Sequence, residues 1–181
     1  GKLRVIKISE QYNNIYNRYL VKYLMGFRFT FAQLGDMTEL RGLVDFMSTQ
    51  ALGYPNYDDW LQRAEHELKS GYKGAILALD RGMVAGDLVY QPHKQIPRFV
   101  EIKNLRIHPN LRMRDFGRFM LKQLEVESRG KYDAVVVDVR SDQPETLGFM
   151  ASQGFTPILN APLYDLNVSD VSAIKFLGRI E

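Results

Sequence analysis

The chain has 181 residues, of which 45% are hydrophobic and 25% are charged, and its formal net charge is +3. This composition is that of an ordinary globular protein with one main domain, and it excludes disordered and fibrous classes. The absence of cysteine excludes disulfides, cysteine zinc sites and thiol nucleophiles, and three histidines are too few for a His-rich metal site. No apolar run approaches the roughly 18 residues of a membrane helix. We expect a cytoplasmic protein with neither a membrane partner nor a metal.

Residues 1–25 are interpreted as an extension, and residues 26–181 as the folded domain. Four tyrosines in the extension follow one another at helical spacing, which places them on one helix face. They are Tyr12, Tyr16, Tyr19 and Tyr23. A packing stripe is the preferred interpretation, because few basic residues are interleaved to support stacking of nucleic-acid bases.

Apolar periodicity and turn residues predict the elements of the rest of the chain. The predicted order is a strand at 27–32, a helix opened by Asp36, a helix at 58–68, strands at 74–79 and 83–91 with a tight turn between them, a strand at 99–107, a helix at 114–128, a strand at 134–139, a helix at 144–152, and two final strands at 155–159 and 163–168.

Positive charge is concentrated between Lys94 and Lys131, where ten Lys/Arg stand against four Asp/Glu. Within this segment a predicted strand runs through a Pro-containing turn directly into a predicted helix. The start of a helix leaves about four backbone N–H groups unpaired and so favours anions. Arg112, Arg114 and Arg118 add full charges there, and Gly117 allows a ligand close to the backbone. The segment therefore predicts a phosphate or pyrophosphate site.

The same segment resembles the acetyl-CoA loop of the GNAT acetyltransferase superfamily, whose pattern is Gln/Arg-x-x-Gly-x-Gly/Ala. Arg112 fills the first position and Gly117 the last, while Asp115 stands where the family usually has its first glycine. A carboxylate near a pyrophosphate is repulsive, so Asp115 either weakens cofactor binding or points toward solvent.

Two further segments resemble the same family, in the same order along the chain. The segment 80–86 is similar to its acidic-x-Gly-x-x-x-Gly hairpin, and 147–155 to its last helix and the Gly-Phe that follows. The resemblance extends from Phe27 to Val168, and its motif spacing is closest to the histone acetyltransferase branch. It implies an α/β fold with a mixed, mostly antiparallel sheet of six to seven strands flanked by about four helices.

The resemblance also implies acetyl-CoA (coenzyme A) as cofactor, held by the backbone of the strand before the loop and by the loop itself. The residues implied are Leu105, Arg106, Ile107, Arg112, Met113, Arg114, Asp115, Phe116, Gly117, Arg118 and Phe149. For Phe149, ordinary packing of the helix is an equal alternative.

Acetyl transfer requires a neutral amine, and a positioned carboxylate can accept its proton. Glu101 is the candidate base, because the histone acetyltransferase branch keeps its catalytic glutamate at the same offset before the loop. A surface glutamate that pairs with Lys103 is the alternative. The tyrosine that many members use as general acid is replaced here by Met150. Asp138 and His108 are weaker candidates for a proton relay.

The acceptor pocket implied by the family draws on Tyr54, Tyr57, Trp60 and Tyr164. The implied function is transfer of an acetyl group from acetyl-CoA to a primary amine, of a small molecule or a protein, by direct attack. A non-catalytic CoA-binding or interaction module remains an alternative because of Asp115 and Met150. A nucleic-acid-binding domain is a weaker one. The sequence leaves a homodimer open.

Overall fold

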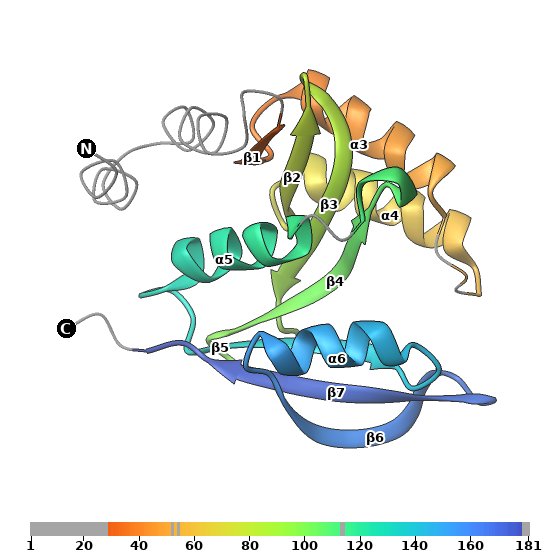
Figure 1. Ribbon diagram of the computed structural model, residues 1–181, viewed down its shortest axis with the longest axis vertical. Coiled ribbons are helices and arrows are strands. Elements are labelled where there is room, and N and C mark those ends of the chain that lie inside the picture. The colour runs from red at the N-terminus through yellow and green to blue at the C-terminus, as the bar shows by residue number, and fades with distance from the viewer. Residues whose placement is uncertain (1–28, 52, 54, 113–114, 179–181) are drawn as a thin grey trace. The chain divides into compact units, whose positions relative to one another are not determined.

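The computed structural model describes residues 29–51, 53, 55–112 and 115–178, so the tyrosine-striped extension lies outside the described residues. Within that part of the chain, seven strands and four α-helices follow one another in the predicted order (Figure 1). The strands are hydrogen-bonded in the order β1-β2-β3-β4-β5-β7-β6. β4 and β5 run parallel, while β1/β2, β5/β7 and β6/β7 are antiparallel. The expected mixed, mostly antiparallel α/β fold is confirmed.

The bounds of most elements agree with the sequence pattern to within two residues. The elements are β1 (Phe29–Gln33), α3 (Met37–Thr49), α4 (Tyr57–Lys69), β2 (Gly74–Asp80), β3 (Met83–Pro92), β4 (Phe99–Ile107), a 3₁₀ turn (Pro109–Leu111), α5 (Phe116–Ser128), β5 (Ala134–Arg140), α6 (Pro144–Ser152), β6 (Thr156–Asp165) and β7 (Val168–Phe176).

Contacts within the chain divide it into two compact units, which we describe separately. The first unit comprises Gly1–Val89 and Asn104–Val126, and the second comprises Tyr90–Lys103 and Glu127–Glu181. The strands β3 and β4 each contribute residues to both.

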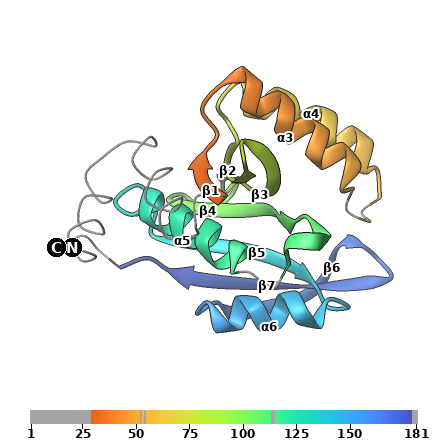
Figure 2. The same cartoon turned by 45° about the horizontal axis from the view of Figure 1, so that its top comes forward.

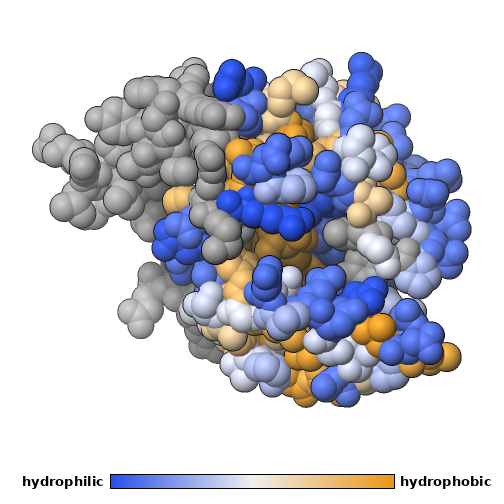
Figure 3. All heavy atoms as spheres, turned by 45° about the vertical axis from the view of Figure 1, so that its right-hand side comes forward, coloured by the Kyte–Doolittle hydropathy of each residue, from blue (hydrophilic) through white to orange (hydrophobic). Residues whose placement is uncertain are grey.

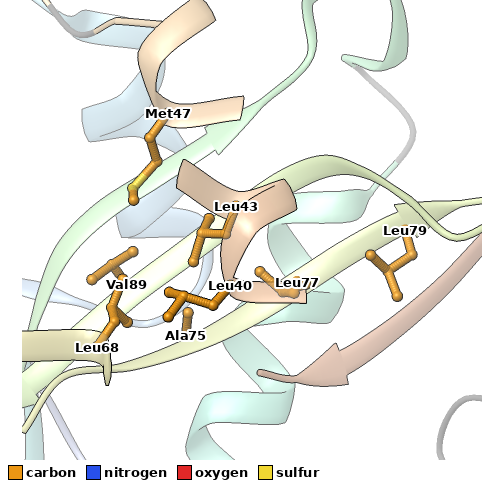
Figure 4. Close-up of a cluster of buried hydrophobic side chains, with 8 residues drawn as sticks. All are labelled: Leu40, Leu43, Met47, Leu68, Ala75, Leu77, Leu79 and Val89. Atoms are coloured by element: carbon orange, nitrogen blue, oxygen red, sulfur yellow. The ribbon is translucent and has the colours of Figure 1, made fainter. Parts of the chain in front are cut away.

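In the first unit, α3 begins where the sequence placed a cap. The Asp36 carboxylate accepts a hydrogen bond from the Glu39 N–H at 2.8 Å, and the Glu39 carboxylate accepts one from the Gly35 N–H at 2.8 Å. These reciprocal bonds satisfy N–H groups that a helix start leaves unpaired. The apolar face of α3 then packs with α4 and β2 in a buried cluster (Figure 4). Its members are Leu40, Leu43, Met47, Leu68, Ala75, Leu77, Leu79 and Val89.

The two glycines of the segment 80–86 are needed for different physical reasons. Arg81 and Gly82 form the two-residue hairpin turn between β2 and β3, with φ angles of 51° and 83°, as expected for a turn whose central residues are both left-handed. At Gly86, a Cβ atom would lie 3.0 Å from the Arg106 carbonyl oxygen and 3.3 Å from the Ala78 Cβ atom. Close packing of neighbouring strands therefore requires the second glycine.

In the second unit, β5 is the central strand, parallel to β4 on one side and antiparallel to β7 on the other. The helix α6 lies along β5 and β7 (Figure 2). Both faces of these strands carry buried apolar side chains, which explains the uninterrupted apolar run of β5. One face includes Val100, Ile102, Val135, Val137 and Ala173, and the other includes Ala134, Val136 and Ile174.

The end of the chain corrects one prediction. The segment 163–168, expected to be the final strand, is instead the end of β6 and a turn, and β7 covers Val168–Phe176. The Asp165 carboxylate accepts a hydrogen bond from the Asn167 N–H at 2.9 Å, which forms the turn. Irregular register between Pro157 and Leu159 and between Ala161 and Asp165 lengthens β6 and breaks the alternation by which a single strand is recognised.

Candidate active site

The register of the second unit brings several polar side chains to one face of the sheet. Glu101 lies opposite Val136, and Asp138 lies opposite Ser172. Directly paired residues point to the same face, as do residues two apart on one strand. Lys103 therefore joins them. We call the following set the polar cluster: Gln91, Glu101, Lys103, Asp138, Tyr164 and Ser172.

The Glu101 carboxylate accepts two side-chain hydrogen bonds of different length. Its Oε1 atom accepts a hydrogen bond from the Lys103 Nζ atom at 2.8 Å, and its Oε2 atom accepts a longer one from the Gln91 Nε2 atom at 3.3 Å. The side chain of Glu101 is 13% exposed and that of Lys103 is 19% exposed. The expected pair with Lys103 is therefore present, but it is partly buried and not a surface pair.

Tyr164 connects this ion pair to Asp138. The Lys103 ammonium lies 5.6 Å from the centre of the Tyr164 ring and 3.5 Å from its hydroxyl oxygen. The Tyr164 hydroxyl donates to the Asp138 Oδ2 atom at 2.7 Å, and the Ser172 hydroxyl donates to Oδ1 at 2.5 Å. Partial burial, and then the Asp138 carboxylate, raise the pKa of Tyr164 above its usual range. The phenol is thus held neutral, as a hydrogen-bond donor.

The residues expected to contact the acetyl group lie farther along β4. The pairing of β4 with β5 ends at Ile102 opposite Val137, so Leu105, Arg106 and Ile107 lie beyond the paired stretch. Leu105 and Ile107 are half-buried. The backbone role that the resemblance implies for the three residues stays a prediction.

The Arg106 side chain, by contrast, belongs to the core of the first unit. Its Nε atom lies 2.7 Å from the Asp87 carboxylate, and the two side chains are 5% and 0% exposed. Its Nη1 atom donates to the Tyr57 hydroxyl at 2.7 Å and to the Gln50 carbonyl at 2.9 Å. Burial outweighs the attraction of Arg106 and raises the pKa of Asp87 to about 6.

The residue before α5 has a left-handed backbone conformation. Asp115 precedes the helix with a φ angle of 61°, and its carbonyl accepts a hydrogen bond from the Phe119 N–H at 3.0 Å. This left-handed conformation gives a physical reason for the family's glycine, and aspartate is among the few other residues that adopt it readily. The Asp115 carboxylate lies 3.5 Å from the guanidinium of Arg118, and both side chains are exposed.

The other described residues of the predicted loop differ in their exposure to solvent. Arg112 is exposed, while Phe116 and Gly117 are buried. Met113 and Arg114 lie outside the described residues.

The aromatic residues predicted for the acceptor pocket have different environments in the described part of the chain. Tyr57 is buried, donates to the Met47 carbonyl at 2.7 Å and stacks on Trp60, with 5.7 Å between ring centres. Trp60 itself packs against the cluster of Figure 4. These contacts favour a core role for both. Tyr54 lies outside the described residues, and Tyr164 belongs to the polar cluster.

Three further candidates are placed by the structure. Met150 is buried in α6, and Phe149 is half-buried on the same helix. The His108 ring accepts a hydrogen bond from the Asn110 N–H at 3.2 Å and so stabilises the turn after β4. Gln91 and Ser172 were not identified from the sequence. The alternating pattern of residues 168–174 was the available signal for Ser172.

Several cations of the basic segment have acidic partners in the described part of the chain. Arg106 is buried with Asp87, Arg98 pairs with Asp133 at 2.8 Å, and Lys122 approaches Glu125 at 3.8 Å. Within the described ranges, no group of His, Asp or Glu side chains is arranged to hold a metal ion. No described helix combines the length and the apolar character needed to cross a bilayer.

Comparison with known proteins identifies the class of fold. No family model matches the sequence, and no curated protein matches it significantly. Among solved structures, the chain is similar to a protein from Desulfovibrio desulfuricans assigned to the GNAT acetyltransferases, with 13% identity, a TM-score of 0.73, and coverage of 83% of this chain and 99% of the other. The chain therefore has the GNAT fold.

Two solved enzymes illustrate the breadth of that fold. An aminoglycoside 6'-N-acetyltransferase complexed with coenzyme A has 13% identity and a TM-score of 0.69, and the match covers 83% of this chain and 98% of the other. The ribosomal-protein-S18-alanine N-acetyltransferase of Escherichia coli has 16% identity and a TM-score of 0.63, with coverage of 84% and 96%. At these identities the comparison establishes the fold and leaves the choice of substrate to the site.

Proposed function

We propose that this protein transfers an acetyl group from acetyl-CoA to a primary amine by direct attack. The observation that carries the proposal is the conformation before α5: Asp115 occupies the motif's glycine position and adopts the left-handed backbone that makes glycine common there. Arg112 and Arg118 supply positive charge beside the helix start. The fold, the motif and the local geometry thus support the same ligand.

Acetyl-CoA would supply the acetyl group as a thioester. The backbone of Leu105–Ile107 would bind the carbonyl and the pantetheine arm, and the N–H groups at the start of α5 would bind the pyrophosphate. Arg112 and Arg118 add charge-assisted contacts to phosphate oxygens.

Glu101 would accept the proton of the acceptor amine. Its Oε2 atom is the more available oxygen, since its contact with Gln91 is 0.5 Å longer than the Oε1 contact with Lys103. The amine nitrogen forms a bond to the carbonyl carbon, the carbon–sulfur bond breaks, and the nitrogen's proton passes to the carboxylate. With Met150 in place of a tyrosine acid, solvent or the leaving thiolate itself accounts for the second proton.

The acceptor class follows from the half-buried carboxylate beside an aromatic ring. An amine entering as an ammonium would meet Glu101 and the face of Tyr164, the two groups that now hold the Lys103 ammonium. Cations are attracted to carboxylates and to aromatic faces. The aminoglycoside and the ribosomal-protein alanine named for two of the similar structures are both acetylated on nitrogen.

The proposal is tested by calorimetric titration with acetyl-CoA, followed by thiol release with kanamycin and with a peptide bearing a free N-terminal alanine. Glu101→Gln should lower turnover by roughly 10²–10⁴ at neutral pH while acetyl-CoA affinity stays near that of the parent. Glu65→Gln, an exposed glutamate of α4, is the matched control. Full activity of Glu101→Gln would disprove its role as base.

Cofactor placement has its own test. Gly117→Val should abolish acetyl-CoA binding, because a bulky side chain would block approach to the backbone. Unchanged binding would disprove the placement. Acetyl-CoA binding without turnover on either acceptor would instead support a non-catalytic CoA-binding module, the alternative that buried Met150 and the Lys103–Glu101 pair favour.

A further inference from the structure

The polar cluster contains two carboxylates but only one ammonium group. Glu101 and Asp138 carry the negative charges and Lys103 carries the positive charge, while the other three members are neutral. Lys103 pairs with Glu101 at 2.8 Å, whereas Asp138 accepts hydrogen bonds from two hydroxyls. The cluster can therefore balance one more cation, and the acceptor amine of the proposed reaction would supply it.

The Tyr164 hydroxyl lies between Lys103 and Asp138. The Lys103 Nζ atom is 3.5 Å from the hydroxyl oxygen, and the hydroxyl donates to the Asp138 Oδ2 atom at 2.7 Å. One oxygen atom thus contacts both the ammonium and the second carboxylate. The strand register agrees, because Ile102 lies opposite Val137, and Lys103 and Asp138 are the next residues on their two strands.

The chemistry of both side chains allows them to meet. A carboxylate has about four lone-pair positions on its two oxygens, and for Asp138 the hydroxyls of Tyr164 and Ser172 use one on each oxygen. A lysine ammonium has three donors on a flexible four-carbon stem. Rotation about the side-chain bonds of Lys103 can therefore bring its ammonium to Asp138 without a change in the backbone.

The surroundings on the β6 side make Asp138 the favoured partner. Leu159 and Leu163 of this strand are 50% and 42% exposed. The space-filling view shows hydrophobic residues at its lower edge, where β6 is drawn in Figure 1 (Figure 3). A charge beside apolar groups is costly unless it is paired. When the Lys103 ammonium leaves Glu101, the second carboxylate is therefore where it is best stabilised.

We propose that Asp138 is a positioning residue for the acetyl transfer proposed above, on which this inference rests. Before the acceptor binds, Lys103 neutralises Glu101. When the acceptor enters as an ammonium, Lys103 turns to Asp138 and the Tyr164 hydroxyl, so that two ion pairs replace one. The Glu101 Oε1 atom, which now accepts from Lys103, then becomes available to the acceptor.

The first test is calorimetric titration of the full chain with kanamycin and with a peptide bearing a free N-terminal alanine, without acetyl-CoA. Asp138→Asn keeps the size of the side chain and removes its charge, so the acceptor should bind about fivefold more weakly, the effect of one partly exposed ion pair. Asp138→Glu keeps the charge and should restore most of the affinity. Asp45→Asn, at an exposed position of α3, is the matched control.

The second test repeats the substitution in a chain without the Lys103 ammonium. In the Lys103→Met background, Asp138→Asn should change acceptor affinity by less than about twofold, because the two effects are coupled. A purely structural role of Asp138, such as holding the Tyr164 ring, would give the same loss in both backgrounds. Circular dichroism should show that each variant is folded, and Asp138→Ser replaces Asp138→Asn if the amide is not tolerated.

The outcomes separate this inference from the proposed function. A parent that binds neither acceptor, an unchanged affinity for Asp138→Asn, or an equal loss in both backgrounds would overturn the role of Asp138. The expected pattern of binding without thiol release would support that role and contradict acetyl transfer to these acceptors. Thiol release with the same KM for the parent and Asp138→Asn would support the transfer and contradict the role of Asp138.

Discussion

Two charged pairs on the strand β4 have opposite environments. Arg106 pairs with Asp87 at 2.7 Å, with side-chain exposures of 5% and 0%, whereas Lys103 pairs with Glu101 at 2.8 Å, with exposures of 19% and 13%. The distances are nearly the same, so distance does not separate a structural pair from a chemical one. A fully enclosed pair cannot meet a ligand, while a partly open one can exchange its partner for a substrate.

The surroundings of each pair reinforce this difference. Arg106 is further fixed by the Tyr57 hydroxyl and the Gln50 carbonyl, which are groups of the core. Glu101 and Lys103 instead belong to the polar cluster, whose side chains come from five strands and include the neutral Tyr164 phenol. We propose that the first pair contributes to stability and the second to proton transfer, and the following experiments test that difference.

The largest expected effect is on stability, from the enclosed pair. Arg106→Met should lower the free energy of unfolding by about 3–5 kcal/mol, because it leaves the Asp87 carboxyl buried without its partner. Urea denaturation measures the change. The double variant Asp87→Leu with Arg106→Met should recover much of the loss, since neither charge is then buried. A loss below about 1 kcal/mol for the single variant would contradict the assignment.

The next effect is the pH dependence that Asp87 confers. Its folded-state pKa of about 6 lies above the ordinary value of 3.8, so between these values the folded protein binds more protons than the unfolded chain. Stability from this group is complete below pH 3.8 and is lost as pH rises through 6. Between pH 4.5 and 7.5 the loss is about 2 kcal/mol.

Asp87→Asn removes this titration and serves as the reference. The difference in unfolding free energy between the parent and Asp87→Asn should decline over that range, as measured by urea denaturation at matched ionic strength. A difference that grows with pH would show that the attraction of Arg106 outweighs burial.

For the open pair, Lys103→Met should affect substrate binding rather than folding. Removing the ammonium leaves Glu101 to the acceptor, so KM for kanamycin should fall by about fivefold, the value of one partly exposed ion pair. Lys122→Met, on a lysine 63% exposed, is the control. A higher KM would instead indicate that Lys103 holds Glu101 in position for the acceptor.

The smallest expected effect concerns Asp115. Asp115→Asn removes its charge but keeps a residue that tolerates the left-handed conformation, so acetyl-CoA should bind roughly two- to fivefold more tightly. The gain should be larger at low salt, where charges are less screened. Asp115→Gly adds the conformational preference of the family's glycine. Calorimetry that shows no gain for Asn and a gain for Gly would assign the effect to the backbone rather than to charge.

Much of the fold could be predicted because local physics decides it. The cap at Asp36 fixes the start of α3, and the left-handed pair Arg81 and Gly82 fixes the hairpin between β2 and β3. The apolar run of β5 predicts a buried central strand. The final strands were mistaken because bulges in β6 break the alternation of side chains. That irregularity depends on pairing with β7, which a single segment does not reveal.

The sequence by itself determined the order of most elements and the local turns and caps, because each depends on residues close together in the chain. Glu101 as base and an anion site at the start of α5 were predicted from the sequence and stay predictions. The tertiary structure determined the side-chain contacts that depend on pairing between distant segments of the chain. Strand register joined Glu101 and Lys103 to Asp138, Tyr164 and Ser172, which are 35 to 71 residues away along the chain. The Tyr57 hydroxyl is buried, and a polar group removed from water needs a hydrogen-bond partner. The guanidinium of Arg106 provides that partner.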